Sequence, residues 1–138
     1  MMKFRCWHEK EKKFYYFRGI FNDFSRYEQL SEPQICLPFQ AKDGAEVYVG
    51  DFLKYFYTEE EIAKNKKIEL EKKINLSYDE IHEVRFGECS CNAHEYELYG
   101  FYRYYKPDGY WSEILTPSEL GYYIVVGNVY QNPELQSD

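Results

Sequence analysis

The short segment 89–94 is the part of the sequence best suited to chemistry, because it holds Cys89, Cys91 and His94. Zinc prefers thiolate and imidazole ligands in a tetrahedral set, and His82 is the candidate fourth ligand. The C-x-C spacing is less common in structural zinc sites than C-x2-C, and no second cysteine pair follows it. We therefore favour free thiols in a polar loop, and we predict no bound metal and no cofactor.

The same residues could supply a nucleophile, with Cys89 or Cys91 beside His94 as the base. No glycine motif that could form an oxyanion hole adjoins them. The acidic stretch 79–83 could provide a carboxylate pair for acid–base chemistry, although surface carboxylates are more often solvated. The sequence also lacks a phosphate-cradling glycine loop. We therefore predict no catalytic residue and expect that the protein is not an enzyme.

The aromatic strand predicted over residues 96–105 is the candidate interaction surface. Alternation along a strand places Tyr99, Phe101, Arg103 and Tyr105 on one face, and the opposite face is aromatic as well. The surplus aromatic face could stack on single-stranded bases, contact another protein or a second copy of the chain, or be covered by other parts of this chain. We favour a protein partner, because a net charge of −7 opposes nucleic acid.

The composition indicates the fold that must position these residues. The chain has 138 residues, enough for one domain spanning 1–138, and 16 Tyr, 10 Phe and 2 Trp favour β structure. Short runs separated by turn residues predict a mainly β fold, α+β by its count of short helices. The predicted strands are residues 4–7, 14–17, 34–39, 46–49, 52–57, 81–86, 96–105, 110–115 and 123–126.

Two helix starts interrupt these strands. Residues 58–61 form a capping-box pattern, and we expect a helical insertion over about 58–75, exposed and docked lightly. Thr116 precedes Pro117 and begins a second helix of about one turn. Residues 132–135 predict a final turn. The strand 123–126 is apolar enough to be buried on both of its faces.

Charge is distributed unevenly along the chain. The first 18 residues are net basic, and residues 74–97 are net acidic. The two segments could pair with each other or remain two solvated faces, and we favour the second interpretation. If the N-terminal bases lie beside the aromatic strand, nucleic-acid binding gains support, whereas pairing with the acidic segment would support protein binding.

The cysteines and the N-terminal segment indicate the compartment. Residues 1–9 lack the apolar run of a signal peptide, so we expect a cytoplasmic protein in which Cys6, Cys36, Cys89 and Cys91 are free thiols. No apolar stretch approaches the roughly 18 residues of a membrane span, and we expect no membrane partner.

Several blocks of the sequence resemble the YopX family of phage and prophage proteins. The start at residues 3–7 and the run D-G-A-E-V-Y-V-G-D-F-L at 43–53 match the family's order, although the first turn is one residue shorter or shifted. The ending at 123–135 is the most specific block. Two internal blocks, 84–88 and 100–102, also match.

The resemblance covers nearly the whole chain and implies a mainly β fold built around an SH3-like barrel, with N-terminal strands and an inserted helix. It also implies a setting in phages and prophages of Gram-positive bacteria, and it brings no functional residues. We therefore expect an accessory protein that binds an unknown host or phage protein, with a homo-oligomer as another possibility. The alternative is a single-stranded nucleic-acid-binding module that uses the basic N-terminal segment and the strand 96–105.

Overall fold

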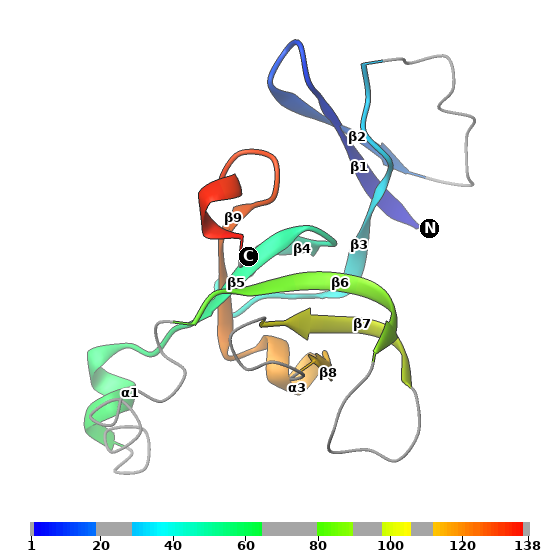
Figure 1. Cartoon of the computed structure of the whole chain (residues 1–138). Helices are drawn as coiled ribbons and strands as arrows, with labels where there is room; N and C mark the ends of the chain where they lie inside the picture. Colours follow the sequence, from blue (N-terminus) through cyan, green and yellow to red (C-terminus); the bar gives the residue numbers. More distant parts are fainter. Residues whose placement is uncertain (1, 19–28, 65–79, 90–97, 106–111, 137–138) are drawn as a thin grey trace.

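The computed structural model describes residues 2–18, 29–64, 80–89, 98–105 and 112–136. Within these ranges the chain forms nine strands and three short helices (Figure 1). In chain order they are β1 (Lys3–His8), β2 (Lys13–Arg18), β3 (Gln34–Gln40), β4 (Glu46–Tyr48), β5 (Asp51–Tyr55), α1 (Glu59–Lys64), β6 (His82–Cys89), β7 (Leu98–Tyr104), β8 (Ser112–Ile114), α3 (Pro117–Leu120), β9 (Tyr123–Asn128) and the 3-10 helix η3 (Pro133–Leu135).

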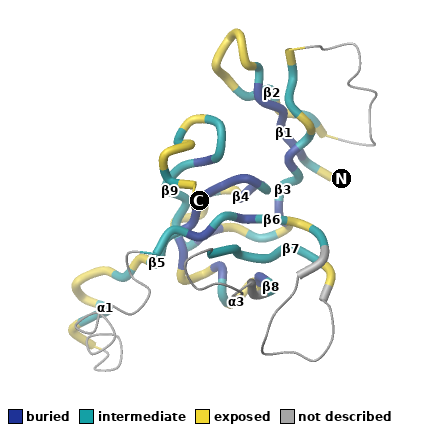
Figure 2. Tube along the Cα trace, in the orientation of Figure 1, coloured by how far each residue is buried: buried dark blue, intermediate teal, exposed yellow. Residues whose placement is uncertain are grey.

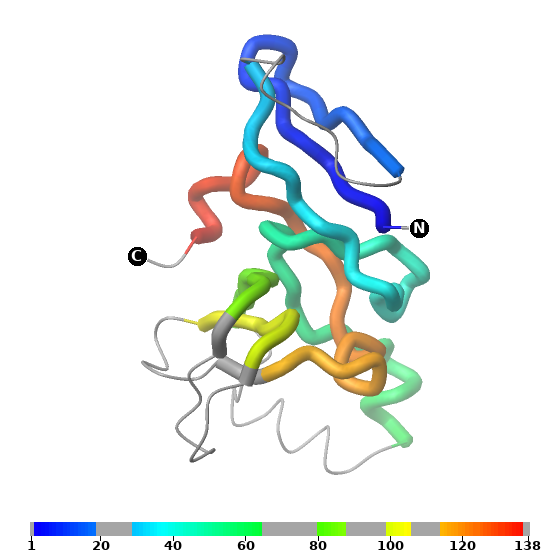
Figure 3. The backbone as a smooth tube through the Cα atoms, turned by 90° about the vertical axis from the view of Figure 1, so that its right-hand side faces the viewer, coloured from blue at the N-terminus to red at the C-terminus, as the bar shows by residue number. Residues whose placement is uncertain are grey.

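The first sheet has the strand order β2-β1-β3-β4, and its neighbouring strands are antiparallel. β1 and β2 pair along their whole length as an N-terminal hairpin, whose tip at residues 9–13 is largely exposed (Figure 2). Trp7 anchors the hairpin, because its ring packs edge-on against Phe14 and stacks on Tyr130, with centroids 4.9 and 5.7 Å away. β3 then runs from the hairpin into the centre of the molecule (Figure 3).

The second sheet has the order β8-β7-β6-β5-β9 and is also antiparallel. A tight turn at Gly50 leads the chain from β4 of the first sheet into β5 of the second. Gly50 has a φ of +94°, and its N–H donates to the carbonyl of Val84 in β6 at 2.8 Å. The positive φ favours glycine here, and a Cβ atom at this position would also displace the end of the Gln34 side chain, whose Nε2 would lie 2.1 Å away.

One hydrophobic core joins the two sheets. Its members come from β3, β4 and the turn between them, from β5, β6 and β9, from α3, and from the residue that follows β8. They are Leu37, Ala41, Val47, Leu53, Val84, Leu115, Leu120 and Tyr123. The sheets therefore share their buried interior, and the prediction of a mainly β fold is confirmed. The finer expectation of an SH3-like barrel stays a prediction.

The two predicted helix starts are both present. At α1 the Thr58 hydroxyl accepts the N–H of Glu61, and the Glu61 carboxylate accepts the N–H of Thr58, which is a reciprocal capping box. The described helix ends at Lys64, so the rest of the predicted insertion lies outside the described residues. At α3 the Thr116 hydroxyl accepts the N–H of Glu119, and Leu120 is buried in the core.

The structure contradicts one expectation about β9. The strand 123–126 was expected to be buried on both faces, but β9 is the last strand of its sheet. Tyr123 is buried, whereas Ile124, Val125 and Val126 are only half-buried. Apolar side chains here cover the end of the core rather than lie between two layers.

Candidate functional site

The four residues of the predicted interaction surface divide into two groups. Tyr99 is 75% exposed, and Phe101 on the same face of β7 packs partly against the core. Arg103 is largely buried, with 12% of its side chain exposed, and Tyr105 is half-buried over His82. The outer pair therefore faces solvent and the groove described next, and the inner pair belongs to a buried cluster.

The outer pair is extended by Phe86 on the neighbouring strand. The Phe86 ring lies 5.3 Å from Tyr99 and 4.8 Å from Phe101, measured between centroids. Phe86 is itself 42% exposed. The β6–β7 hairpin thus presents three aromatic rings in contact with one another, which is an exposed apolar feature of the kind that marks interaction surfaces.

An apolar groove adjoins these rings and is called here the β3–β7 groove. It has a volume of about 460 Å³ and connects Phe101 of β7 to the length of β3. Its rim carries an ion pair between Lys3 and Glu46. The lining residues are Met2, Lys3, Ile35, Cys36, Leu37, Pro38, Phe39, Gln40, Glu46 and Phe101. Most of these side chains are apolar, so the groove fits an apolar group of a partner.

The inner pair surrounds a buried histidine. Nδ1 of His82 lies 3.4 Å from a guanidinium nitrogen of Arg103, and Nε2 lies 3.2 Å from a Glu80 carboxylate oxygen. Arg103 can only donate, so Nδ1 is the acceptor and Nε2 carries the proton. Burial, together with the nearby Arg103 charge, lowers the pKa of His82 to about 3. The imidazole is therefore neutral at physiological pH.

Three of the four lysines in the N-terminal segment form ion pairs with glutamates. Lys12 pairs with Glu9 and Lys13 with Glu11 inside the hairpin, and Lys3 pairs with Glu46 of β4. Lys3 does reach the groove that Phe101 lines, but its ammonium group is held by Glu46. In the described ranges, Glu80 accepts a hydrogen bond from the neutral His82, and Glu83 forms an ion pair with Arg85. Among the described residues, no ion pair joins the basic N-terminal segment to the acidic segment.

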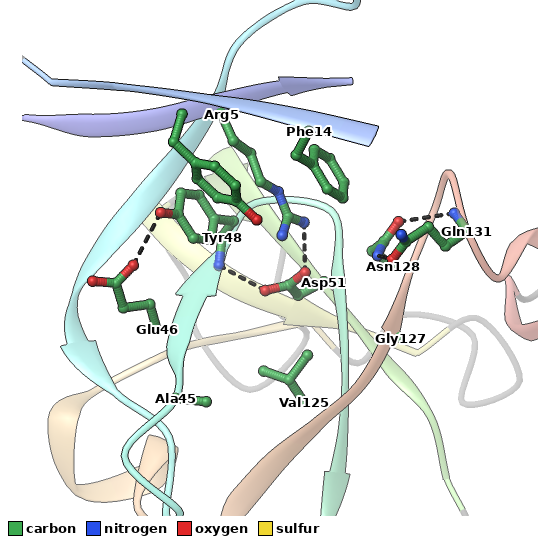
Figure 4. Close-up of a pocket in the computed structure, with 11 residues that line it drawn as sticks. Arg5, Phe14, Ala45, Glu46, Tyr48, Asp51, Val125, Gly127, Asn128 and Gln131 are labelled. Carbon is green, nitrogen blue, oxygen red and sulfur yellow. Dashed lines mark hydrogen bonds and ion pairs between the residues drawn. The ribbon is translucent and has the colours of Figure 1, made fainter. Parts of the chain in front are cut away.

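A second opening, called here the Arg5 cleft, lies between the N-terminal hairpin, β4 and β9 (Figure 4). It has a volume of about 510 Å³. The lining residues are Arg5, Phe14, Tyr16, Ala45, Glu46, Tyr48, Asp51, Val125, Gly127, Asn128 and Gln131. Its walls are aromatic on the hairpin side and small or amide-bearing on the β9 side.

Arg5 forms the polar end of this cleft. Its guanidinium lies between the rings of Phe14 and Tyr48, 4.0 and 4.5 Å from their centroids. Nη2 donates to Oδ1 of Asp51 at 2.5 Å, and Nε donates to Oε1 of Gln34 at 2.8 Å. Burial raises the pKa of Asp51, and the Arg5 charge opposes that rise. The ion pair holds the hairpin on the β4–β5 turn.

Sequence reasoning missed the Arg5–Asp51 pair, although a signal existed. Arg5 interrupts the otherwise apolar run 4–7, and a charge inside such a run needs a buried partner. Asp51 precedes the buried pair Phe52 and Leu53 in the same way. Asp51 also accepts the N–H of Tyr48 at 2.8 Å, so one carboxylate closes a turn and neutralises a distant guanidinium.

Most of the residues that were considered for metal binding or thiol chemistry lie outside the described ranges. Cys91 and His94 are outside the described residues, and of Cys89 only the backbone is described. Cys6 is buried and Cys36 half-buried, both are free thiols, and burial raises the pKa of each. Among the residues that the structure describes, no cluster of three or more His, Cys, Asp or Glu could hold a metal ion.

Together, the fold and the two openings define a small domain of two antiparallel sheets that share one core. No family model matches the chain, and no curated protein matches it. The chain is similar in structure to the crystal structure of protein EF1440 from Enterococcus faecalis, with a TM-score of 0.54 and 15% sequence identity. The match covers 99% of both chains, so the likeness extends over the whole fold. In the described part of the chain, no helix is long and apolar enough to cross a membrane.

Proposed function

We propose that this protein is a non-enzymatic accessory protein that binds another protein through the β3–β7 groove and the exposed rings of Phe86 and Tyr99. The observation that carries the proposal is their continuity, since Phe101 lines the groove and also contacts Phe86. Aromatic residues and methionine are enriched at the centres of protein interfaces, and both kinds are present here. The groove accepts an apolar anchor, and the rings supply the surrounding contact area.

The setting forms part of the same proposal. The resemblance to the YopX family supports a phage or prophage protein acting in the cytoplasm of a Gram-positive bacterium. The partner is then a host protein, a phage protein or a second copy of the chain. Nucleic acid is the alternative, but three of the four N-terminal lysines, Lys3, Lys12 and Lys13, are engaged in ion pairs with glutamates.

The experiment compares affinity capture by three tagged proteins from lysate of a Gram-positive host, with and without nuclease. Tyr99→Glu places a charge in the proposed contact area, and Tyr122→Glu is the matched control, because Tyr122 is also exposed, at 47%, but lies outside the groove. We expect the wild type and Tyr122→Glu to retain the same nuclease-resistant partner and Tyr99→Glu to lose it. Sedimentation of the three purified proteins tests whether the partner is a second copy.

Two outcomes would count against the proposal. Equal capture by both tyrosine variants would show that the β6–β7 rings are not the contact surface. Capture that nuclease removes would support the nucleic-acid alternative, and salt should then weaken it strongly, because phosphate contacts release counterions.

A further inference from the structure

The Arg5 cleft separates the edges of the two sheets. β4 is the last described strand of the first sheet and β9 the last of the second. At one end of the cleft the turn before β4 contacts the start of β9, where the N–H of Lys42 donates to the carbonyl of Tyr123 at 2.9 Å. Above that contact they diverge, and Ala45 and Glu46 on one side face Val125 and Gly127 on the other across the opening (Figure 4).

The pairing register shows which backbone groups face the cleft. In antiparallel strands, successive residues direct their N–H and C=O groups alternately toward one neighbour and then the other. The carbonyl of Tyr123 points away from β5, since it accepts from Lys42, and Leu53 pairs with Val125 two residues further on. The N–H and C=O of Val125 therefore point toward the cleft. Among the described residues, neither group has a hydrogen-bond partner.

The Arg5 guanidinium adds one side-chain donor to this edge. Nε and Nη2 are engaged by Gln34 and Asp51, and Nη1 has no hydrogen-bond partner in the described ranges. The side chain is only 7% exposed and ends at the cleft, as Figure 4 shows. A guanidinium nitrogen that ends at an open cleft and has no protein acceptor can donate to a ligand oxygen.

The charges at the cleft decide which oxygen fits. Asp51 balances Arg5, and Lys3 balances Glu46, whose carboxylate also accepts from the Tyr48 hydroxyl at 3.1 Å. A further carboxylate would be a buried charge without a counterion, which is costly. The side-chain carbonyl of Asn or Gln accepts from Nη1 without adding charge.

We propose that the Arg5 cleft binds an extended peptide segment of a partner protein as an added β-strand. The segment pairs with the free edge of β9 through Val125 and presents one Asn or Gln side chain to Arg5. Its neighbouring side chains contact the rings of Phe14 and Tyr16. This is strand addition to an exposed sheet edge, in which main-chain bonds provide affinity and side-chain contacts provide specificity. The site goes beyond the β3–β7 groove, which is formed by other strands.

The test begins with a library of random heptapeptides displayed on phage and selected on the whole protein. We expect enriched peptides to share an Asn or Gln at one fixed position. A labelled synthetic peptide from the selection is then titrated against Val125→Pro, which removes the outward N–H, and against Val125→Ala, which keeps it. Loss of one hydrogen bond should weaken binding about tenfold in Val125→Pro relative to Val125→Ala. Replacing the fixed Asn or Gln of the peptide by Asp or Glu should weaken binding by at least a similar factor.

Hydrogen exchange of the wild-type protein tests the proposal even if Val125→Pro fails to fold. Bound peptide should slow exchange of the Val125 amide, because a strand partner then protects it. Unchanged exchange at Val125, or enrichment of acidic peptides, or the absence of any enriched peptide, would overturn the proposal. Tyr99→Glu should bind the peptide like the wild type, so the outcome here is independent of the proposed function.

Discussion

Arg5 is a charged side chain that lies almost wholly inside the protein, and its surroundings account for its position. Two aromatic rings cover the flat faces of the guanidinium, while Gln34 and Asp51 accept hydrogen bonds at its edge. A guanidinium group is planar and weakly hydrated, so it stacks between aromatic rings better than a lysine ammonium group does. The arrangement joins the first strand of the chain to a turn far along the sequence, so its main effect is to fix the hairpin in place.

Breaking the Arg5–Asp51 pair should destabilise the protein strongly. Arg5→Met leaves the Asp51 carboxylate buried without its counterion, and Asp51→Asn leaves the guanidinium in the same position. Each single change should lower the free energy of unfolding by about 3 to 5 kcal/mol. The double variant should lose clearly less than the two single losses combined, since neither charge is then left alone. Urea denaturation of the four proteins measures this, and simple additivity would contradict the interpretation.

His82 predicts how stability depends on pH. Its pKa is lowered to about 3 in the folded protein, whereas an exposed histidine has a pKa of about 6.5. The unfolded chain therefore binds a proton between these values that the folded chain does not bind. The contribution of His82 to the free energy of unfolding is fully present above about pH 6.5 and decreases as the pH is lowered toward 3.

The size of this effect can be measured by comparison with His82→Gln. Between pH 7 and pH 5 the wild type should lose about 2 kcal/mol more unfolding free energy than the variant loses. The variant will be less stable at pH 7, because the ring contacts of His82 with Tyr105 and Tyr123 are removed. Only the difference in pH dependence tests the prediction, and equal losses in the two proteins would contradict it.

At the scale of elements, local sequence patterns were sufficient for most strands and for both helix starts. Short apolar and aromatic runs between turn residues predicted the strands that became β1 to β9, and side-chain caps at Thr58 and Thr116 were correctly placed. These features depend on neighbours in the sequence. Asn132, the first residue of the turn predicted over 132–135, shows the limit, because its side chain accepts the N–H of Asn128 and does not cap η3.

The two capped helices should respond differently to loss of the cap. α3 carries the buried Leu120, whereas α1 has no buried residue. Thr116→Ala should therefore lower the global free energy of unfolding by about 1 kcal/mol. Thr58→Ala should lower it by less than about 0.5 kcal/mol, because α1 can fray without exposing the core. Thermal or urea unfolding of both variants provides the measurement, and equal losses would show that α1 is coupled to the core.

The arrangement of the elements was less accessible to sequence reasoning. The apolar run 123–126 suggests a central strand, yet β9 is at an edge, because strand order depends on contacts between residues far apart. The same is true of the candidate surface, because alternation along 96–105 predicted only that Tyr99, Arg103 and Tyr105 share one face. It could not show that His82 from another strand would lie beneath them. The Arg5 cleft was missed for this reason as well.

At the scale of the whole molecule, the shared core predicts a single unfolding transition. Leu37 and Val47 of the first sheet belong to the same cluster as Leu53 and Val84 of the second. Neither sheet can lose its packing without exposing the interior of the other. Far-UV circular dichroism and tryptophan fluorescence should therefore give coincident urea transitions. In a Trp111→Phe variant, whose remaining tryptophan is Trp7, an earlier fluorescence change would show that the N-terminal hairpin opens separately.

The position of β5 between β6 and β9 has a consequence for the order of biosynthesis. A ribosome produces β5 before either of its neighbours, and β9 is made last of the three. Until then Phe52 and Leu53, both almost fully buried in the finished protein, have no second strand beside them. Such incomplete sheets expose apolar surface and unpaired edges, which favour aggregation. The nascent chain therefore completes its fold only after β9 has left the ribosome, and chaperones that hold unfolded chains have a long interval in which to bind it.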